Sequence, residues 1–139
     1  MIDRIHHIAV VVQSIDAALP FYRDVMGLTV TNDRVMDDQG VRGVLLAMGE
    51  NEIELIEPVR EDTGVARYLA SKGETLHHIC FRTHDIDAEL ARLNAQGVEM
   101  IDTTSRNGLA GRIAFIHPKS MHGVLVEIAQ PPAGAHQSD

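Results

Sequence analysis

The chain contains few basic and few aromatic residues and only one cysteine. Its 139 residues include 12 Lys and Arg against 20 Asp and Glu, and the net charge of −8 argues against a nucleic-acid partner. The single cysteine, Cys80, excludes an intramolecular disulfide framework. Because Cys80 lies in an apolar stretch, we expect its side chain to be buried and reduced.

Long hydrophobic runs are also missing. The longest apolar run, residues 8–12, is far shorter than the roughly 20 residues that span a bilayer, so we expect no membrane partner. A predicted strand begins almost at the first residue and leaves no room for a signal peptide, which predicts a cytoplasmic protein. The hydrophobic share of 45% and the charged share of 23% are typical of a globular protein, and the length predicts a single domain, residues 1–139.

The sequence is built from two similar halves. The segment His6-His7-Ile8 recurs as His77-His78-Ile79, 71 positions later. Residues 15–17 recur as 86–88 at the same offset, and residues 53–55 resemble residues 126–128 at an offset of 73. Because the matches follow the same order in both halves, we interpret the chain as a tandem pair of related modules.

Each module is expected to contain a strand, a helix and three further strands. In module one (residues 4–58) the strands are expected at 4–12, 29–35, 42–48 and 52–57. The helix is expected at 14–26, with Ser14 or Asp16 as its N-cap, Pro20 near its first turn and Gly27 at its end. In module two (residues 76–130) they are expected at 77–83, 98–102, 111–116 and 124–129, with a helix from Asp85 to 96. A helix at 63–72 connects the modules, and residues 131–139 form a flexible tail. The predicted fold is α+β, with two βαβββ modules related by a pseudo-twofold axis.

Each module carries one histidine in its first strand and one glutamate in its last. These are His7 and Glu54, 47 positions apart, and His78 and Glu127, 49 apart. Side by side, the modules would bring all four to a shared cleft, and two imidazoles with two carboxylates suit a divalent cation such as cobalt, manganese, nickel, iron or zinc. Such a set leaves coordination positions open for catalysis. A histidine in an apolar strand is more often a core residue than a ligand, and His6 and His77 repeat as well, so the spacing alone leaves the register open.

The motifs of the chain resemble a known superfamily over roughly residues 4–130. They are residues 7–10, 21–24 with 27–28, 39–41, 52–58, 76–79 and, most specifically, 113–120 followed by 123–128. On these motifs the chain resembles the vicinal oxygen chelate (glyoxalase/bleomycin-resistance) superfamily and, more narrowly, the methylmalonyl-CoA epimerase family. The resemblance implies that His7, Glu54, His78 and Glu127 are the metal ligands, with cobalt expected first and manganese, nickel or zinc as alternatives.

The resemblance implies an isomerase that interconverts (2R)- and (2S)-methylmalonyl-CoA through an enolate stabilised by the metal. Inversion in one step needs a base on each face of the α-carbon. Some members of the family carry a second catalytic Glu in the strand that holds Gly43 here, and Gln at the position of Glu54. We therefore expect Glu54 and Glu127 to be ligands and opposed bases at once. In the alternative, Glu54 is a ligand only.

Substrate contacts are expected from two loops. Gln39 lies in a glycine-flanked turn, and Lys119 and Ser120 lie in a proline-containing loop before the last strand. No glycine-rich phosphate loop is present, so an acyl-CoA substrate has to be held by scattered basic residues. The candidates are Arg42, Arg67, Lys72, Arg106 and Arg112.

Three other functions use the same fold. A glyoxalase-type lyase shares the ligand set and acts on a hemithioacetal, but the 113–120 motif and the lack of tryptophan argue against it. A second alternative is a metal-free protein that sequesters a drug; such proteins lack the four ligands, so the complete His/Glu set argues against it. A ring-cleaving dioxygenase uses only two His and one Glu. The resemblance also leads us to expect a homodimer. The two possible substrates, methylmalonyl-CoA and ethylmalonyl-CoA, differ by one methylene, and the sequence leaves the choice between them open.

Overall fold

The computed structural model describes residues 1–133 and divides into two compact units. The first unit combines residues 1–7 with the chain from His78 onward, and the second unit is Ile8–His77. Strands β1 (Ile2–Val11) and β5 (Thr75–Thr83) therefore contribute residues to both units. The assignment of residues 1–139 to a single domain stays a prediction.

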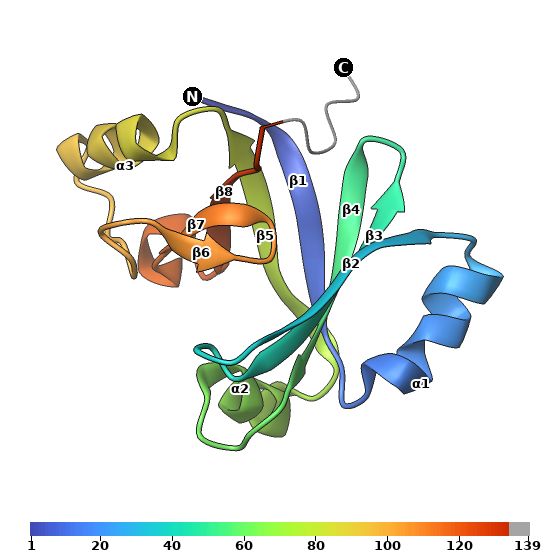
Figure 1. The fold of residues 1–139 in the computed structure, drawn as a ribbon. Helices are drawn as coiled ribbons and strands as arrows, with labels where there is room; N and C mark the ends of the chain where they lie inside the picture. Colours follow the sequence, from blue (N-terminus) through green and yellow to red (C-terminus); the bar gives the residue numbers. More distant parts are fainter. Residues whose placement is uncertain (134–139) are drawn as a thin grey trace. The chain divides into compact units, whose positions relative to one another are not determined.

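The second unit is a sheet covered by a short helix (Figure 1). Its strands follow the order β2-β3-β4-β1, and both β2–β3 and β3–β4 are antiparallel. Apolar side chains of α1 pack against alternate residues of β3 and β4, because successive strand residues point to opposite faces. The bounds are β2 Thr29–Met36, β3 Val41–Met48, β4 Asn51–Pro58, α1 Ile15–Leu19, the π-helical segment η1 Pro20–Val25 and α2 Gly64–Lys72.

The first unit repeats this plan. Strand β5 pairs in parallel with β8, and β8–β7 and β7–β6 are antiparallel, in the order β1-β5-β8-β7-β6. Helix α3 places Ile86, Leu90 and Leu93 at helical spacing against apolar residues of β7 and β8. The bounds are α3 Ile86–Ala95, β6 Arg106–Gly108, β7 Gly111–Ile116, the 3₁₀ segment η2 Pro118–Met121 and β8 Val126–Gln130.

The α+β class and the βαβββ element order are confirmed, and several local signals are confirmed with them. Ser14 caps α1 by accepting a hydrogen bond from Ala17 N at 3.1 Å, and Asp85 caps α3 in the same way. The connecting helix ends before Gly73, which has a φ of 77°. Cys80 is fully buried, as expected from its apolar surroundings.

The helix predicted for residues 14–26 is not a regular α-helix. It is α-helical only to Leu19 and then continues as the π-helical segment η1, in which Met26 N donates to Phe21 O at 2.9 Å. Pro20 explains the change, because it has no N–H to donate to the preceding turn and its ring crowds that turn's carbonyl. Gly27, with a φ of 81°, then ends the segment as predicted.

The strand predicted at residues 98–102 is wrong. Only Met100 forms an isolated bridge, to Ile116, and the second strand of the module is instead β6. The carboxylate of Asp102 accepts the backbone N–H of Phe115 at 2.9 Å and so takes a donor that a strand ladder would use. The last strand also starts at Val126, two residues later than predicted.

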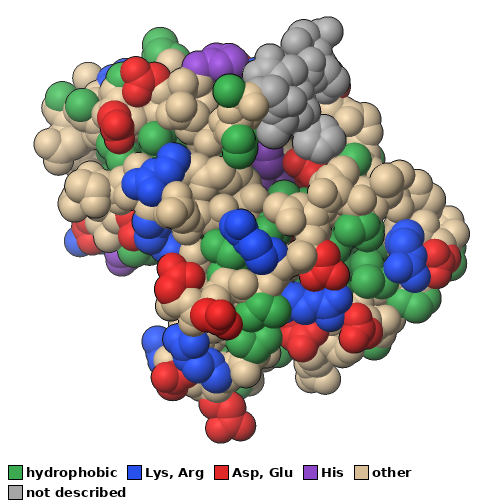
Figure 2. Space-filling view, viewed as in Figure 1, with side chains coloured by type: hydrophobic (Ala, Val, Ile, Leu, Met, Phe, Trp, Pro, Cys, Tyr) green, Lys and Arg blue, Asp and Glu red, His purple; other side chains and the backbone are tan. Residues whose placement is uncertain are grey.

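The tail predicted at residues 131–139 falls largely on residues 134–139, which lie outside the described part of the chain. Within residues 1–133, no helix is both long and apolar enough to cross a membrane. Basic and acidic side chains are interspersed on the face that Figure 2 shows. Arg42 illustrates this mixing, because its guanidinium lies 2.9 Å from a carboxylate oxygen of Asp16 and 2.9 Å from one of Asp33.

A substitution at Gly111 tests the packing of β7 against β8. Gly111 has a φ of 118°, and a Cβ there would lie 2.3 Å from the backbone oxygen of Gln130. We expect Gly111→Ala to lower the free energy of unfolding by at least about 2 kcal/mol in urea titrations. Gly97→Ala is the control, because Gly97 also has a positive φ (78°) but nothing within 4 Å, and a loss of about 1 kcal/mol is expected. Equal losses for the two variants would contradict the steric argument.

An ion pair joins β1 to β5 in the first unit and predicts a pH dependence. Arg82 donates two hydrogen bonds to Asp3, at 3.0 and 2.7 Å, and this guanidinium lowers the pKa of Asp3 from 3.8 to about 2. A lowered pKa stabilises the fold above the unfolded-state pKa, and this contribution is lost as the pH falls from about 4 to about 2. Because the Asp3 side chain is one-third exposed, we expect Asp3→Asn to cost only about 1 kcal/mol at pH 7.

The measurement is the urea-unfolding free energy of the wild type and Asp3→Asn at pH 7 and at about pH 2.5. The difference should shrink towards zero at the lower pH. Asp24→Asn removes a more exposed pair, with Arg23, and serves as the control, for which little change is expected at either pH. A cost of Asp3→Asn that does not depend on pH would show that the ion pair is not its source.

Candidate active site

Three of the four predicted ligands lie together in the first unit. His7 comes from β1, His78 from β5 and Glu127 from β8, and their exposed fractions are 0%, 5% and 5%. His7 Nε2 lies 3.2 Å from His78 Nε2 and 3.0 Å from Glu127 Oε1, and His78 Nε2 lies 3.3 Å from the same oxygen. Two ring nitrogens and one carboxylate oxygen therefore converge on one point.

The strands explain why these side chains converge. Strand β5 lies between β1 and β8, and its Cys80 is paired in register with Glu127. On the other side of β8, Glu127 is paired with Phe115 of β7. The Phe115 ring stands perpendicular to the His78 imidazole, with ring centroids 5.2 Å apart. Neighbouring strands thus hold the three polar groups within an apolar setting.

The two histidines shift the pKa of the Glu127 carboxyl group. Burial by itself would raise this pKa, but the nearby charges of His78 and His7 oppose it, and the net effect lowers the pKa below its usual range. Its Oε1 is buried and has no hydrogen bond of acceptable geometry, although the two imidazoles lie near. A buried anionic oxygen that faces two ring nitrogens without such a bond fits a divalent cation, as does the N/O donor set.

Glu54 lies in the second unit, on β4. Its exposed fraction is 7%, and it is paired with Leu45 of β3. Glu52, on the same face of β4, is also buried and accepts a hydrogen bond from the Thr31 hydroxyl at 2.6 Å. A buried carboxylate is costly unless it has a partner, and Thr31 supplies one for Glu52. The role of Glu54 as the fourth ligand stays a prediction.

The predicted substrate-binding residues lie in loops and turns. Gln39 is half-buried in the turn between β2 and β3, where its N–H donates to Met36 O at 3.1 Å. Lys119 is exposed on η2. The Ser120 hydroxyl oxygen accepts the N–H of Glu99 at 2.8 Å, a structural contact that the sequence did not predict. Their contacts with substrate stay predictions.

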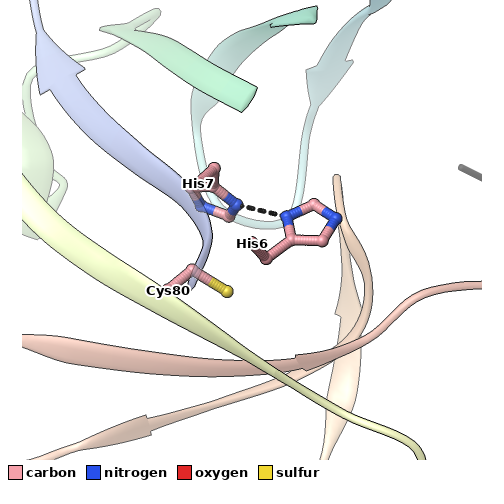
Figure 3. Close-up of side chains that lie close together, drawn as sticks. All are labelled: His6, His7 and Cys80. Atoms are coloured by element: carbon pink, nitrogen blue, oxygen red, sulfur yellow. Dashed lines mark hydrogen bonds between the residues drawn. The ribbon is translucent and has the colours of Figure 1, made fainter. Parts of the chain in front are cut away.

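The sequence did not predict a role for His6. His6 is 95% buried, and its Nδ1 lies 2.8 Å from Nδ1 of His7 (Figure 3). The other nitrogen of the His7 ring, Nε2, is the atom near His78 and Glu127. The repeat of both histidines at 77 and 78 was a signal, but alternation along a strand predicted that His6 would point away from its neighbour. Phe115 was missed as well, although it is paired with Glu127.

Known proteins are similar to this chain over almost its whole length. Residues 6–115 match the glyoxalase/bleomycin resistance protein/dioxygenase superfamily. The ethylmalonyl-CoA/methylmalonyl-CoA epimerase of Cereibacter sphaeroides is 32% identical over 94% of this chain and 99% of its own length. A methylmalonyl-CoA epimerase in complex with methylmalonyl-CoA and NH4+ is 38% identical, with a TM-score of 0.90 over 96% of this chain and 97% of that one.

A variant of the Streptomyces coelicolor methylmalonyl-CoA epimerase has been solved in complex with 2-nitronate-propionyl-CoA. It shows the same similarity, 38% identity and a TM-score of 0.90, over 96% of this chain and 97% of that chain. Fold, length and sequence therefore agree. The chain belongs to the glyoxalase/bleomycin resistance protein/dioxygenase superfamily and, within it, to the family of the methylmalonyl-CoA epimerases.

Proposed function

We propose that this protein is an epimerase that interconverts the (2R) and (2S) forms of methylmalonyl-CoA. The observation that carries the proposal is the convergence of His7, His78 and Glu127 within 3.3 Å of one another, in a chain that aligns end to end with epimerases of this substrate. The α-proton of methylmalonyl-CoA lies between a thioester and a carboxylate. Its removal leaves an enolate, whose negative charge the site has to stabilise.

The complexes of the relatives support this chemistry. One solved epimerase holds methylmalonyl-CoA, and another holds 2-nitronate-propionyl-CoA. A nitronate is planar at the former α-carbon and carries its negative charge on oxygen, as an enolate does. A site that binds such a group is suited to an enolate intermediate. Because the present chain shares the fold over nearly its full length, we infer the same reaction class for it.

We propose that His7, His78 and Glu127 hold a divalent cation, with Glu54 as the fourth ligand. Cobalt is the expected ion, and manganese, nickel and zinc also suit the donor set. When bound, the cation supplies Lewis-acid stabilisation of the negative charge that develops on the substrate oxygens. In this proposal the Glu127 carboxylate also accepts the α-proton from one face of the substrate.

We propose Glu54 and Glu127 as the two bases, one for each face of the α-carbon. Gly43 has no side chain to serve as a base, but it is paired with Ile56, and Leu45 is paired with Glu54. Positions two apart on a strand point to the same face of a sheet, so positions 43 and 45 of β3 share a face. Glu54, which is paired with Leu45, lies on that face too, next to the pair formed by Gly43 and Ile56. A carboxylate on β4 thus stands close to where other family members carry one on β3.

Substrate contacts and assembly complete the proposal. Lys119 is an exposed cation on η2, and Gln39 offers an amide from a half-buried turn. We propose that these two residues, with the Ser120 hydroxyl, contact the carboxylate, the thioester or the phosphates of the acyl-CoA. A homodimer remains the expected assembly, on the basis of the family resemblance.

The function is tested by proton NMR of methylmalonyl-CoA in deuterated buffer. We expect the α-proton signal to disappear with Co²⁺-loaded protein and to persist with chelator-treated protein. If a sample shown to hold its metal leaves the signal intact, the epimerase proposal is wrong. Hemithioacetal substrates would then be tested for the lyase activity of related folds.

The cation site generates a prediction that does not depend on turnover. We expect Glu127→Gln to weaken Co²⁺ binding by more than the roughly 10- to 100-fold that loss of an outer-shell partner costs, because it removes the charged ligand oxygen. Binding is measured by competition with a chelator. Glu99→Gln makes the same chemical change at a half-exposed position beside His117 and should bind Co²⁺ as the wild type does. Equal affinities for all three proteins would place the cation elsewhere.

The two-base proposal predicts a split between two observable reactions. With Glu54→Gln, we expect epimerisation to fall by about 100- to 10,000-fold, whereas Glu127 still exchanges the α-proton of one epimer with deuterium. NMR follows the exchange for each epimer separately. Glu52→Gln, on the same strand and face, is the matched control and should epimerise normally once its folding is verified. Unchanged epimerisation by Glu54→Gln with metal still bound would show that Glu54 is not a base.

A further inference from the structure

His6 makes a contact with a ligand histidine that the reaction chemistry does not explain. His6 and His7 are neighbours on β1, yet both imidazoles are buried and their Nδ1 atoms lie 2.8 Å apart (Figure 3). The other ring nitrogen of His7, Nε2, faces His78 and Glu127. The two nitrogens of the His7 ring therefore meet different partners, one on each side.

The hydrogen count of the two rings limits what this contact can be. A neutral imidazole carries one N–H, and two ring nitrogens at 2.8 Å share a single hydrogen. If His6 donates it, the hydrogen of His7 is on Nε2, where it blocks a cation. If His7 donates it, Nε2 keeps its lone pair for a cation. His7 Nε2 and His78 Nε2 also share one hydrogen, at 3.2 Å, and only the second arrangement leaves His7 Nε2 free of its own hydrogen, as a cation at that point requires.

We propose that His6 is a positioning residue that holds His7 in its Nδ1–H tautomer and so prepares Nε2 as a ligand. The inference rests on the cation site of the proposed function and deepens it. Ligand histidines usually donate their second N–H to a carboxylate, a carbonyl or a water. Here the acceptor is Nδ1 of a second imidazole, which orients the ring without adding a negative charge beside the site.

Cys80 completes the group in Figure 3 and offers a competing explanation. Its sulfur and one nitrogen of each ring lie within 4.8 Å of one another, close enough for a separate soft-metal site. The Cys80 thiol is fully buried and donates to the backbone oxygen of Phe81 at 3.7 Å, so it has a partner without a metal. The shared hydrogen between the rings also occupies the place of a metal. Cys80 is therefore a packing residue beside the histidine pair.

The repeat supplies a matched control for His6. His77 precedes the ligand His78 as His6 precedes His7. The His77 ring, however, contacts the Tyr68 ring edge-on, with centroids 4.8 Å apart. A substitution at 77 alters the side chain next to a ligand histidine without touching the His6–His7 contact.

The first test reads the tautomer directly in the metal-free wild type. Long-range proton–nitrogen NMR of the imidazoles, at about pH 8 where histidine is neutral, distinguishes Nδ1–H from Nε2–H. We expect Nδ1–H for His7 and Nε2–H for His6. An Nε2–H tautomer at His7 would overturn the inference. This result needs neither substrate nor turnover, so failure of the epimerase proposal is recognised separately by the α-proton exchange assay.

The second test compares three variants in Co²⁺ binding. His6→Leu removes the acceptor at similar volume and should weaken binding by about 10- to 100-fold, whereas His6→Asn, whose side-chain oxygen sits near the place of Nδ1, should stay within about threefold of the wild type. His77→Leu should bind as the wild type does. A purely structural role of His6 would weaken both variants alike, and wild-type affinity of His6→Leu would also overturn the inference. The NMR tautomer of His7 is then measured in His6→Asn, where Nδ1–H should be retained.

Discussion

The buried negative charge of Glu127 is the constraint on which the rest of the first unit depends. A carboxylate that is 95% removed from water is strongly destabilising unless opposite charge or hydrogen bonds compensate for it. Two imidazoles, one on β1 and one on β5, lie 3.0 and 3.3 Å from the same oxygen, and the cation proposed between them would supply the opposite charge. The register of β1, β5 and β8 must therefore be held closely, and the Asp3–Arg82 pair holds β1 to β5 four residues from each histidine.

Much of this arrangement could be predicted from the sequence because both the repeat and the strand alternation are physical signals. The recurrence of His7 as His78, and of Glu54 as Glu127, placed these residues at equivalent points of two modules, and three of them are indeed close together. Capping residues and glycines predicted most helix ends correctly, because those positions require a specific backbone conformation or a side-chain acceptor. Two predictions failed where a single residue changes the local hydrogen bonding, Pro20 within α1–η1 and Asp102 before β6.

The contact between His6 and His7 could not be predicted for a different reason. Alternation along a strand assigns neighbours to opposite faces, and this rule ignores that two adjacent rings are able to turn toward each other when both are buried. Tertiary packing decides such a rotamer choice, and a single sequence does not record it. The same holds for Ser120, whose hydroxyl accepts the N–H of a residue 21 positions earlier.

The net charge of the proposed metal site relates the proposed acceptor role of His6, which is neutral, to the proposed ligand role of the Glu54 carboxylate. In the proposed site, Glu54 and Glu127 would give the protein ligands two negative charges, which equal the charge of a divalent cation. A carboxylate behind His7 would add a third and weaken the attraction between the site and an enolate. An imidazole would orient His7 equally well and add no charge, so the proposed glutamate ligand at 54 and the proposed histidine acceptor at 6 are consistent with each other.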